Sequence, residues 1–272
     1  RLWLTISEGS APNPSALFER VCRAPLPDHL PEGAPLALRV ALHHAQGLAG
    51  EGQARSVIYS ALKASFEARA LTPPHEVPWA HTGSSDQPTQ RLLAYVERGR
   101  LTLRLDASGE LLHKRGWRTE DGAAPLRPTL ASACLQALEW SPEEALLDVM
   151  CGSGSFSVEA LSLALKRSPH TRCFACERWV SFQPEGWSRV IAEQQTPQLE
   201  RLEGLRWWVS DQSEAQLSLA KTHISAYLNA HASSVMSSPL SRSLPQPLTP
   251  TQANALELTW EQVSAAWSAP LP

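Results

Sequence analysis

The sequence predicts an α/β protein whose second half is built around a parallel sheet with helices on both faces. Between residues 145 and 232, apolar strand-like runs alternate with helical patterns, which favours strand–helix–strand units. One of these units carries a glycine turn, "CGSG" at 151–154, between the run "ALLDVM" and the helical pattern "SFSVEALSLALKR". A strand, a glycine turn and a helix in this order are typical of doubly wound folds.

The composition is that of a folded protein with a sizeable core. The chain has 272 residues, of which 43% are hydrophobic and 19% charged, which argues against disorder. No run approaches the roughly 18 continuous apolar residues of a membrane span, so no membrane partner is expected. The five cysteines are scattered and odd in number; they favour a reducing compartment, and cytoplasmic localisation is the expectation. No metal site is expected either: Cys173 and Cys176 lack a second ligand pair.

The charge is unevenly distributed along the chain. Residues 1–118 carry 14 basic and 11 acidic side chains, whereas residues 119–272 carry 10 and 16, and the net charge is -3. This balance argues against a strongly basic nucleic-acid protein, although the basic front half allows a polyanion partner. Ordinary surface variation explains it equally well. Because the first residue is Arg1, we also expect the chain to be a piece of a longer protein.

The first half is expected to begin with alternating strands and helices. Apolar alternation predicts strands, and apolar residues at helical spacing predict helices. A hairpin is expected next, with "LTLRLD" and "LLHKRGW" as its strands and "ASGE" as its turn. The expected strands are 1–6, 36–44, 101–106 and 111–117, and the expected helices are 14–22 and 54–68.

The second half is expected to alternate more regularly. A helix from about 129 to 140 leads into the strand that precedes the glycine turn. The expected strands are 145–150, 171–177, 205–211 and 255–260, and the other expected helices are 155–167 and 213–232.

The glycine turn favours one kind of cofactor over others. Gly152 and Gly154 allow a sharp bend and the close approach of a ligand, and the following helix points its free N–H groups at that ligand. Ser157 occupies the place of the third glycine in the GxGxxG pattern, which argues against NAD or FAD. S-adenosyl-L-methionine (SAM) tolerates this change, because the loop then faces the methionine moiety and ribose rather than a pyrophosphate.

Two acidic residues stand where a ribose-bearing cofactor would need them. Asp148 ends the strand before the loop, and Asp211 ends the strand "LRWWVSD" directly before a helix. In the cofactor interpretation, Asp211 accepts hydrogen bonds from the ribose hydroxyls. The alternative is that both acids cap helices.

Four stretches together resemble the THUMP-domain RNA N2-guanosine methyltransferases, especially the bacterial large-subunit rRNA methyltransferase K/L group. They are "LRLDASGELLHKRGWR", "APLRPTLASACL", "DVMCGSGSFSVEA" and "CFACERW". Val149 and Ser155 replace the proline and threonine common in the family's cofactor loop. The resemblance spans roughly residues 35–215 and is specific in combination.

The resemblance implies a THUMP/ferredoxin-like α+β module followed by an incomplete class I (Rossmann-like) SAM-dependent methyltransferase domain. Residues 1–34 would be the end of an N-terminal ferredoxin-like part, and residues 35–110 the THUMP RNA-binding domain. Residues 111–272 would be the first half of the methyltransferase domain. On this interpretation, the chain is truncated at both ends.

The resemblance also implies site residues. Asp148, Cys151, Gly152 and Gly154 would form the SAM loop, and Asp211 would hold the ribose. Leu126 and Thr129 would line the methionine side. Glu261 would lie near the adenine amine, although a plain surface charge is an equal alternative.

RNA contacts are expected from the basic stretch "HKRGWR". Lys114, Arg115 and Arg118, interleaved with an aromatic residue, could touch RNA phosphate or position the target base. The alternative is a solvated hairpin end. The expected partner is RNA, and 23S rRNA in particular.

No residue of the chain is expected to be catalytic. The family carries Asn or Asp, Pro, Pro and an aromatic residue after its fourth strand, and no such motif occurs here. The implied activity, methylation of guanine N2 in 23S rRNA, would belong to the full-length parent, and the piece alone would be inactive, with one edge of the strand at 145–150 open. A non-catalytic RNA- or SAM-binding remnant is the alternative, and a dinucleotide oxidoreductase is disfavoured.

Overall fold

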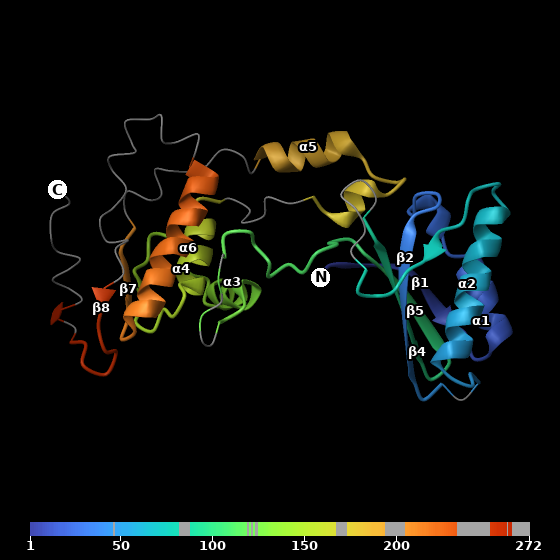
Figure 1. The fold of residues 1–272 in the computed structure, drawn as a ribbon, viewed down its shortest axis with the longest axis horizontal. Helices are drawn as coiled ribbons and strands as arrows, with labels where there is room; N and C mark the ends of the chain where they lie inside the picture. Colours follow the sequence, from blue (N-terminus) through green and yellow to red (C-terminus); the bar gives the residue numbers. More distant parts are fainter. Residues whose placement is uncertain are drawn as a thin grey trace. The chain divides into compact units, whose positions relative to one another are not determined.

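The chain folds into two compact units (Figure 1). The computed structural model describes residues 1–45, 47–81, 88–118, 120, 122, 125–166, 173–193, 205–232, 251–259 and 261–262. The first unit contains residues 1–112 and 172–186, and the second contains residues 113–171 and 187–272. The main division thus lies close to the one expected after residue 110, but a later stretch of the chain joins the first unit.

The first unit contains a five-stranded mixed sheet. Its strand order is β1-β5-β4-β2-β3; β5 pairs antiparallel with β1 and β4, and β2 pairs parallel with β4 and β3. Residues 1–34 therefore do not form a separate part, because they supply an edge strand of this sheet and one of its helices. The strands are β1 (Trp3–Ser10), β2 (Pro35–His43), β3 (His75–Glu76), β4 (Gln90–Glu97) and β5 (Arg100–Asp106).

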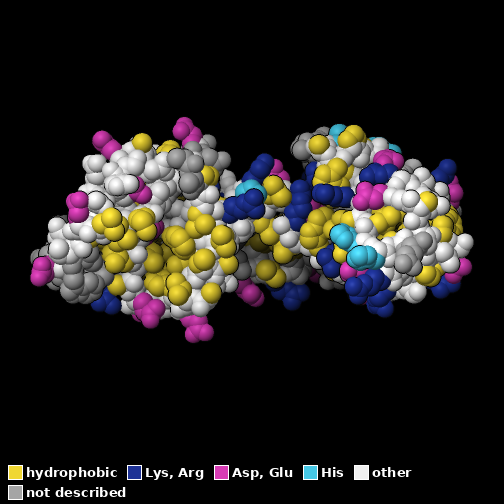
Figure 2. Space-filling model, turned by 90° about the horizontal axis from the view of Figure 1, so that it is seen from below, with side chains coloured by type: hydrophobic (Ala, Val, Ile, Leu, Met, Phe, Trp, Pro, Cys, Tyr) yellow, Lys and Arg dark blue, Asp and Glu magenta, His cyan; other side chains and the backbone are white. Residues whose placement is uncertain are grey.

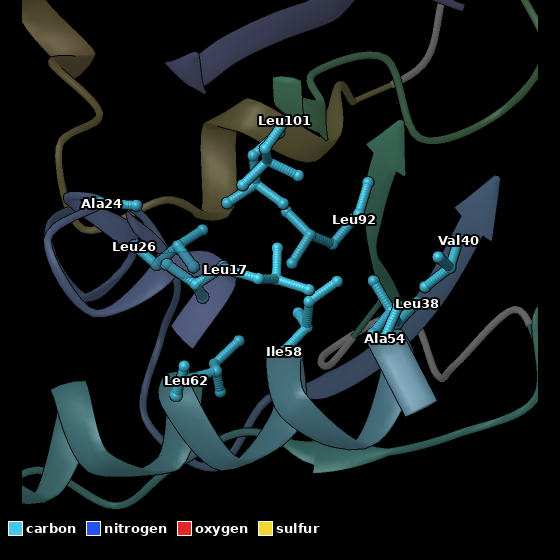
Figure 3. Packing of buried hydrophobic residues seen from close by; sticks show 14 of the residues in the cluster. Leu17, Ala24, Leu26, Leu38, Val40, Ala54, Ile58, Leu62, Leu92 and Leu101 are labelled. Carbon is cyan, nitrogen blue, oxygen red and sulfur yellow. The ribbon is translucent and has the colours of Figure 1, made fainter. Parts of the chain in front are cut away.

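The first unit also contains the α-helices α1 (Pro14–Cys22) and α2 (Glu51–Glu67) and the short 3-10 helix η1 (Leu26–Asp28). The side chain of Asn13 caps α1 by accepting a hydrogen bond from the Ala16 N–H at 2.9 Å. Figure 3 shows Leu17 of α1 and Ile58 of α2 together with Leu92 of the sheet, and all three are fully buried. The unit thus combines a mixed sheet with helices, and its identity as a THUMP/ferredoxin-like module stays a prediction.

The expected hairpin at 101–117 is wrong in its second strand. β5 turns back onto β4 instead, with Leu92 opposite Leu105 and Val96 opposite Leu101. Residues 111–118 form no strand. The physical reason is burial: β4 offers β5 a buried apolar face, whereas "HKR" at 113–115 would place three polar side chains in succession.

The strand expected at 171–177 is also wrong over its described part. Ala175–Arg178 form a short 3-10 helix, η2, which belongs to the first unit; residues 171 and 172 lie outside the described residues. The carboxylate of Glu177 accepts a hydrogen bond from the Phe174 N–H at 2.6 Å and so stabilises a turn. Trp179 follows, is 8% exposed, and donates its indole N–H to the side-chain oxygen of Gln90 at 3.0 Å. α5 (Pro184–Glu193) comes next.

The second unit contains a parallel sheet in the order β6-β7-β8. Among the described strands, β6 lies at one edge and pairs only with β7. The strand expected at 255–260 is wrong: the chain turns at 255–257 and the strand lies earlier, while residue 260 lies outside the described residues. The elements are α3 (Pro128–Ala137), β6 (Leu146–Asp148), α4 (Ser155–Ala164), β7 (Trp207–Asp211), α6 (Glu214–Ala232) and β8 (Thr251–Gln252).

The core of the second unit lies between the sheet and helices α4 and α6. Trp207 of β7, Leu161 of α4 and Tyr227 of α6 are all nearly or fully buried there. Figure 2 shows hydrophobic side chains gathered on one face of this unit, and Leu138, Leu147 and Met150 are among its exposed apolar residues. Among the described residues, no helix combines the length and the apolar character that crossing a bilayer requires.

Candidate cofactor site

The glycine turn joins β6 to α4. Gly152 and Gly154 have φ angles of 52° and 80°, in the left-handed region that favours glycine. Gly154 is the N-cap of α4, and a Cβ on it would lie 3.1 Å from the Cβ of Ala220. A side chain at position 154 would therefore strain the backbone and crowd Ala220 of α6.

Asp211 holds the turn from the end of the neighbouring strand. Its Oδ2 accepts a hydrogen bond from the Gly152 N–H at 2.9 Å, and its Oδ1 accepts one from the Ser213 N–H at 2.9 Å. The carboxylate thus links the loop to the beginning of α6. A carboxylate has about four acceptor positions, so these two bonds leave capacity for further donors. The expected contact with a ribose stays a prediction.

Asp148 lies at the end of β6, beside the loop. Its Oδ2 accepts a hydrogen bond from the Ser157 hydroxyl at 3.0 Å, so the residue in the third-glycine position acts as a donor to the loop's acid. Burial raises the pKa of Asp148 to about 6, and the nearby Asp211 adds to this effect. The two carboxylates therefore share the carboxyl edge of β6 and β7, where open α/β sheets bind ligands.

Cys151 is part of the loop but has no reactive thiolate. It is 8% exposed, and its N–H donates to the carbonyl oxygen of Ser210 at 3.0 Å. Burial raises the pKa of its thiol to about 12, with Asp148 and Asp211 adding to the shift. A neutral thiol of this kind has a packing role rather than a nucleophilic one.

The residues expected on the methionine side lie before and within the first turn of α3. The carbonyl oxygen of Leu126 accepts a hydrogen bond from the Ser155 hydroxyl at 3.0 Å, which connects this segment to the start of α4. Thr129 is half-buried in the first turn of α3. Glu261 is exposed and lies beyond the turn at 255–257. The roles given to these three residues stay predictions.

The structure contradicts the expectation that Arg115 binds RNA phosphate. Its guanidinium donates to Glu159 of α4 at 3.0 Å, and the side chains of the pair are only 8% and 1% exposed. Arg118 donates to the Leu126 carbonyl and to the Ser155 hydroxyl, and its guanidinium lies over the Trp117 ring. The solvated hairpin end, the alternative interpretation, is equally wrong for these two residues.

The pair of Arg115 and Glu159 is instead part of the framework beneath the loop. Burial raises the pKa of Glu159, while Arg115 and Ser132 oppose the shift. The physical reason for burial is that α4 turns Glu159 toward the core cluster, where only a paired charge is tolerated. Lys114 alone of the three expected RNA-binding residues is exposed.

One residue of the site was missed by sequence reasoning. His223 of α6 is fully buried, and its Nδ1 lies 2.9 Å from the carbonyl oxygen of Ser153 in the loop. Its ring also makes an edge contact with Trp117, with 5.4 Å between the ring centroids. The available signal was a polar residue on a helix face that is otherwise apolar, formed by Leu217, Ala220 and Ile224.

The first unit contains a separate cavity. It has a volume of about 480 Å³ and is lined by Pro12, His44, Gly47, Arg98 and Gly99. Arg98 makes no ion pair among the described residues. Within those same residues, no group of three His, Cys, Asp or Glu side chains could hold a metal ion.

The raised pKa of Asp148 predicts a pH-dependent stability. An acid whose pKa is higher in the folded than in the unfolded chain lowers stability as the pH rises from about 4 to about 6. Asp148→Asn removes the buried charge but keeps an acceptor for Ser157. We therefore expect the free energy of unfolding of the variant to be about 1–2 kcal/mol higher than that of the native chain at pH 7.5.

Urea denaturation of both proteins at pH 4.5 and at pH 7.5 checks this. The two should be of similar stability at the lower pH and diverge at the higher one. A variant that is less stable than the native chain at both pH values would contradict the prediction.

Comparisons with known proteins place the second unit in context. Residues 115–238 match a family model described as "UPF0020: RMKL-like, methyltransferase domain". The chain is 43% identical over 113 residues to the ribosomal RNA large subunit methyltransferase K/L of Marinobacter nauticus. It is 39% identical over 114 residues to the protein of the same name from Chromohalobacter salexigens. These matches cover 39% and 40% of this chain, but only 15% and 16% of the length of the relatives.

Solved structures extend the likeness over nearly the whole chain. A predicted N6-adenine-specific DNA methylase from Listeria monocytogenes matches 95% of this chain and 62% of its own, with a TM-score of 0.75 and 21% identity. SMU.472 complexed with SAH (S-adenosylhomocysteine) matches 94% of this chain and 62% of its own, with a TM-score of 0.72 and 21% identity. The chain therefore has the fold of these proteins, and residues 115–238 are similar in sequence to RMKL-like methyltransferase domains.

Proposed function

We propose that this chain is part of a SAM-dependent RNA methyltransferase, in which the second unit binds the cofactor and the first unit binds RNA. The observation that carries the proposal is the joint geometry of the glycine turn and Asp211 at the carboxyl edge of the sheet. The match of residues 115–238 to a methyltransferase domain supports it, as does the fold shared with a protein solved complexed with SAH.

The residues present fit SAM. The loop lacks the third glycine of the dinucleotide pattern, which allows close packing of the helix on the strand, and Ser157 in its place donates its hydroxyl to Asp148. Asp211 retains acceptor capacity for ribose hydroxyls, and the N-terminus of α4 favours a negatively charged group such as the methionine carboxylate. When bound, SAM supplies an electrophilic methyl group.

The chain's own residues would bind and orient the cofactor. Asp211 would fix the ribose while holding Gly152, and the buried loop would exclude water from one side of the site. Leu126 and Thr129 would line the methionine side, and Glu261 would lie near the adenine amine. No residue of the chain is assigned the alignment of the target amine, because the Asn/Asp-Pro-Pro-Tyr/Phe motif is absent from the 272 residues.

We propose guanine N2 in 23S rRNA as the target, methylated by the longer protein in the cytoplasm. The support is the sequence relationship to ribosomal RNA large subunit methyltransferases K/L. The alternative is a non-catalytic remnant that binds RNA or SAM. The first unit would contact RNA through its basic side chains, with Arg98 and His44 at the cavity and Lys114 in the segment that follows.

Cofactor binding is the first test. The chain should bind SAH in titration calorimetry, and Asp211→Ala should weaken binding by about 1.5–3 kcal/mol, because charge-assisted hydrogen bonds are lost. Glu214→Ala is the matched control: it removes an exposed carboxylate three residues later and should leave the affinity unchanged. Binding of NADH with none of SAH would refute the assignment.

RNA binding is tested by its salt dependence. The full chain should bind structured 23S rRNA fragments weakly, and the affinity should fall steeply as salt rises, because phosphate contacts release counterions. Arg98→Ala should weaken binding and flatten the salt dependence. Arg23→Ala, which removes an exposed cation already paired with Glu19, should have little effect. Filter binding at several salt concentrations measures this, and salt-independent binding would count against the proposal.

A methyl-transfer assay tests whether the chain alone is inactive, as proposed. A radiolabelled-methyl assay on undermethylated 23S rRNA should show no turnover by residues 1–272 alone, since nothing aligns the amine for attack. Transfer by the chain alone would show that the assignment of the catalytic residues outside it is wrong.

A further inference from the structure

Three successive residues of the glycine turn are each held by the segment that runs from β7 into α6. Gly152 donates its N–H to Asp211. A Cβ on Gly154 would lie only 3.1 Å from the Cβ of Ala220. Ser153 lies between them, with its carbonyl oxygen 2.9 Å from Nδ1 of His223. The first two contacts have clear roles in the loop. The third contact comes from the buried imidazole of His223, which has no role in the proposed function.

The hydrogen bond fixes the tautomer of His223. A carbonyl oxygen only accepts, so the Nδ1 atom of His223, 2.9 Å away, must carry a proton and donate it. The ring is fully buried, packs edge-on against Trp117, and its Nε2 has no partner among the described residues. A polar ring buried with one nitrogen unsatisfied costs free energy, so a leucine of similar size would fit this core more favourably.

The peptide unit between Ser153 and Gly154 is held at both ends. His223 donates to the carbonyl oxygen of Ser153, and the N–H of Gly154 donates to the carbonyl oxygen of Cys151 at 2.8 Å. This peptide precedes a glycine in the left-handed region, where rotation meets little steric resistance. Without a donor at position 223, the carbonyl could turn away from α6 and change the surface that the loop presents to a ligand.

We propose that His223 is a positioning residue for cofactor binding, which locks the Ser153–Gly154 peptide in its binding orientation. This inference rests on the proposed SAM site and deepens it. Asp211, the proposed ribose ligand, holds Gly152 and the start of α6, and His223 of α6 holds the carbonyl of Ser153 in the middle of the loop. His223 does not touch the cofactor, and its effect passes through the loop backbone.

Paired substitutions test the role. His223→Leu keeps the bulk and removes the donor, whereas His223→Asn places an N–H donor near the position of Nδ1. Ile224→Val is the control, since it trims the neighbouring buried side chain without touching the loop. We expect His223→Leu to weaken SAH binding by about tenfold, and His223→Asn and Ile224→Val to stay within about threefold of the native affinity.

Hydrogen exchange of the ligand-free proteins gives a second readout. Amides of a peptide spanning 151–157 should exchange faster in His223→Leu than in the native chain, and His223→Asn should restore slow exchange. Equal affinities and equal exchange in the Leu and Asn variants would overturn the inference. If the native chain binds no SAH, the proposed function fails, and the exchange comparison alone decides whether His223 orders the loop.

Discussion

The hydrogen bond between the Gly152 N–H and the Asp211 carboxylate is the contact on which the candidate site depends. It joins the end of β7 to a turn that lies 59 residues earlier in the chain, and Asp211 also binds the N–H of Ser213 at the start of α6. The positions of the loop, the acid and the helix are thereby coupled. A ligand that binds at this edge of the sheet would meet groups whose orientation is already fixed, which lowers the ordering cost of binding.

The buried polar groups beneath the loop lower the stability of the fold. Asp148 and Glu159 are buried acids whose pKa values are raised by burial, and His223 leaves a buried nitrogen without a described partner. Isolated, each of these groups would destabilise the fold. Their concentration around one turn is typical of functional sites, where stability is exchanged for a fixed arrangement of polar groups.

Much of the fold could be predicted from sequence periodicity, and the misses have local causes. The helix predicted at 14–22 matches α1, and the strand–turn–helix around Gly152 lies where it was expected. The stretch "TRCFACE" alternates like a strand, but Glu177 closes a turn on Phe174 instead. The partner of β5 was missed because no strand was expected at residues 90–97, where β4 lies.

The site was less predictable than the fold, because its contacts join residues far apart in the sequence. Nothing near Arg115 indicates that Glu159, 44 residues later, would take it into the core. His223 contacts a loop 70 residues away. Glycines and strand-end acids are visible locally because their conformational roles are local, whereas the partners of a buried cation or imidazole emerge only when the helices pack.

The central claim is that the glycine turn, Asp211 and α6 together form a SAM site. Amide NMR of the full chain during titration with SAH tests it most directly. We expect shifts concentrated at Gly152, Ser153, Ser155 and Asp211, at the carboxyl edge of the β6-β7-β8 sheet. Saturable shifts confined to residues of the first unit, with none in the glycine turn, would contradict the account.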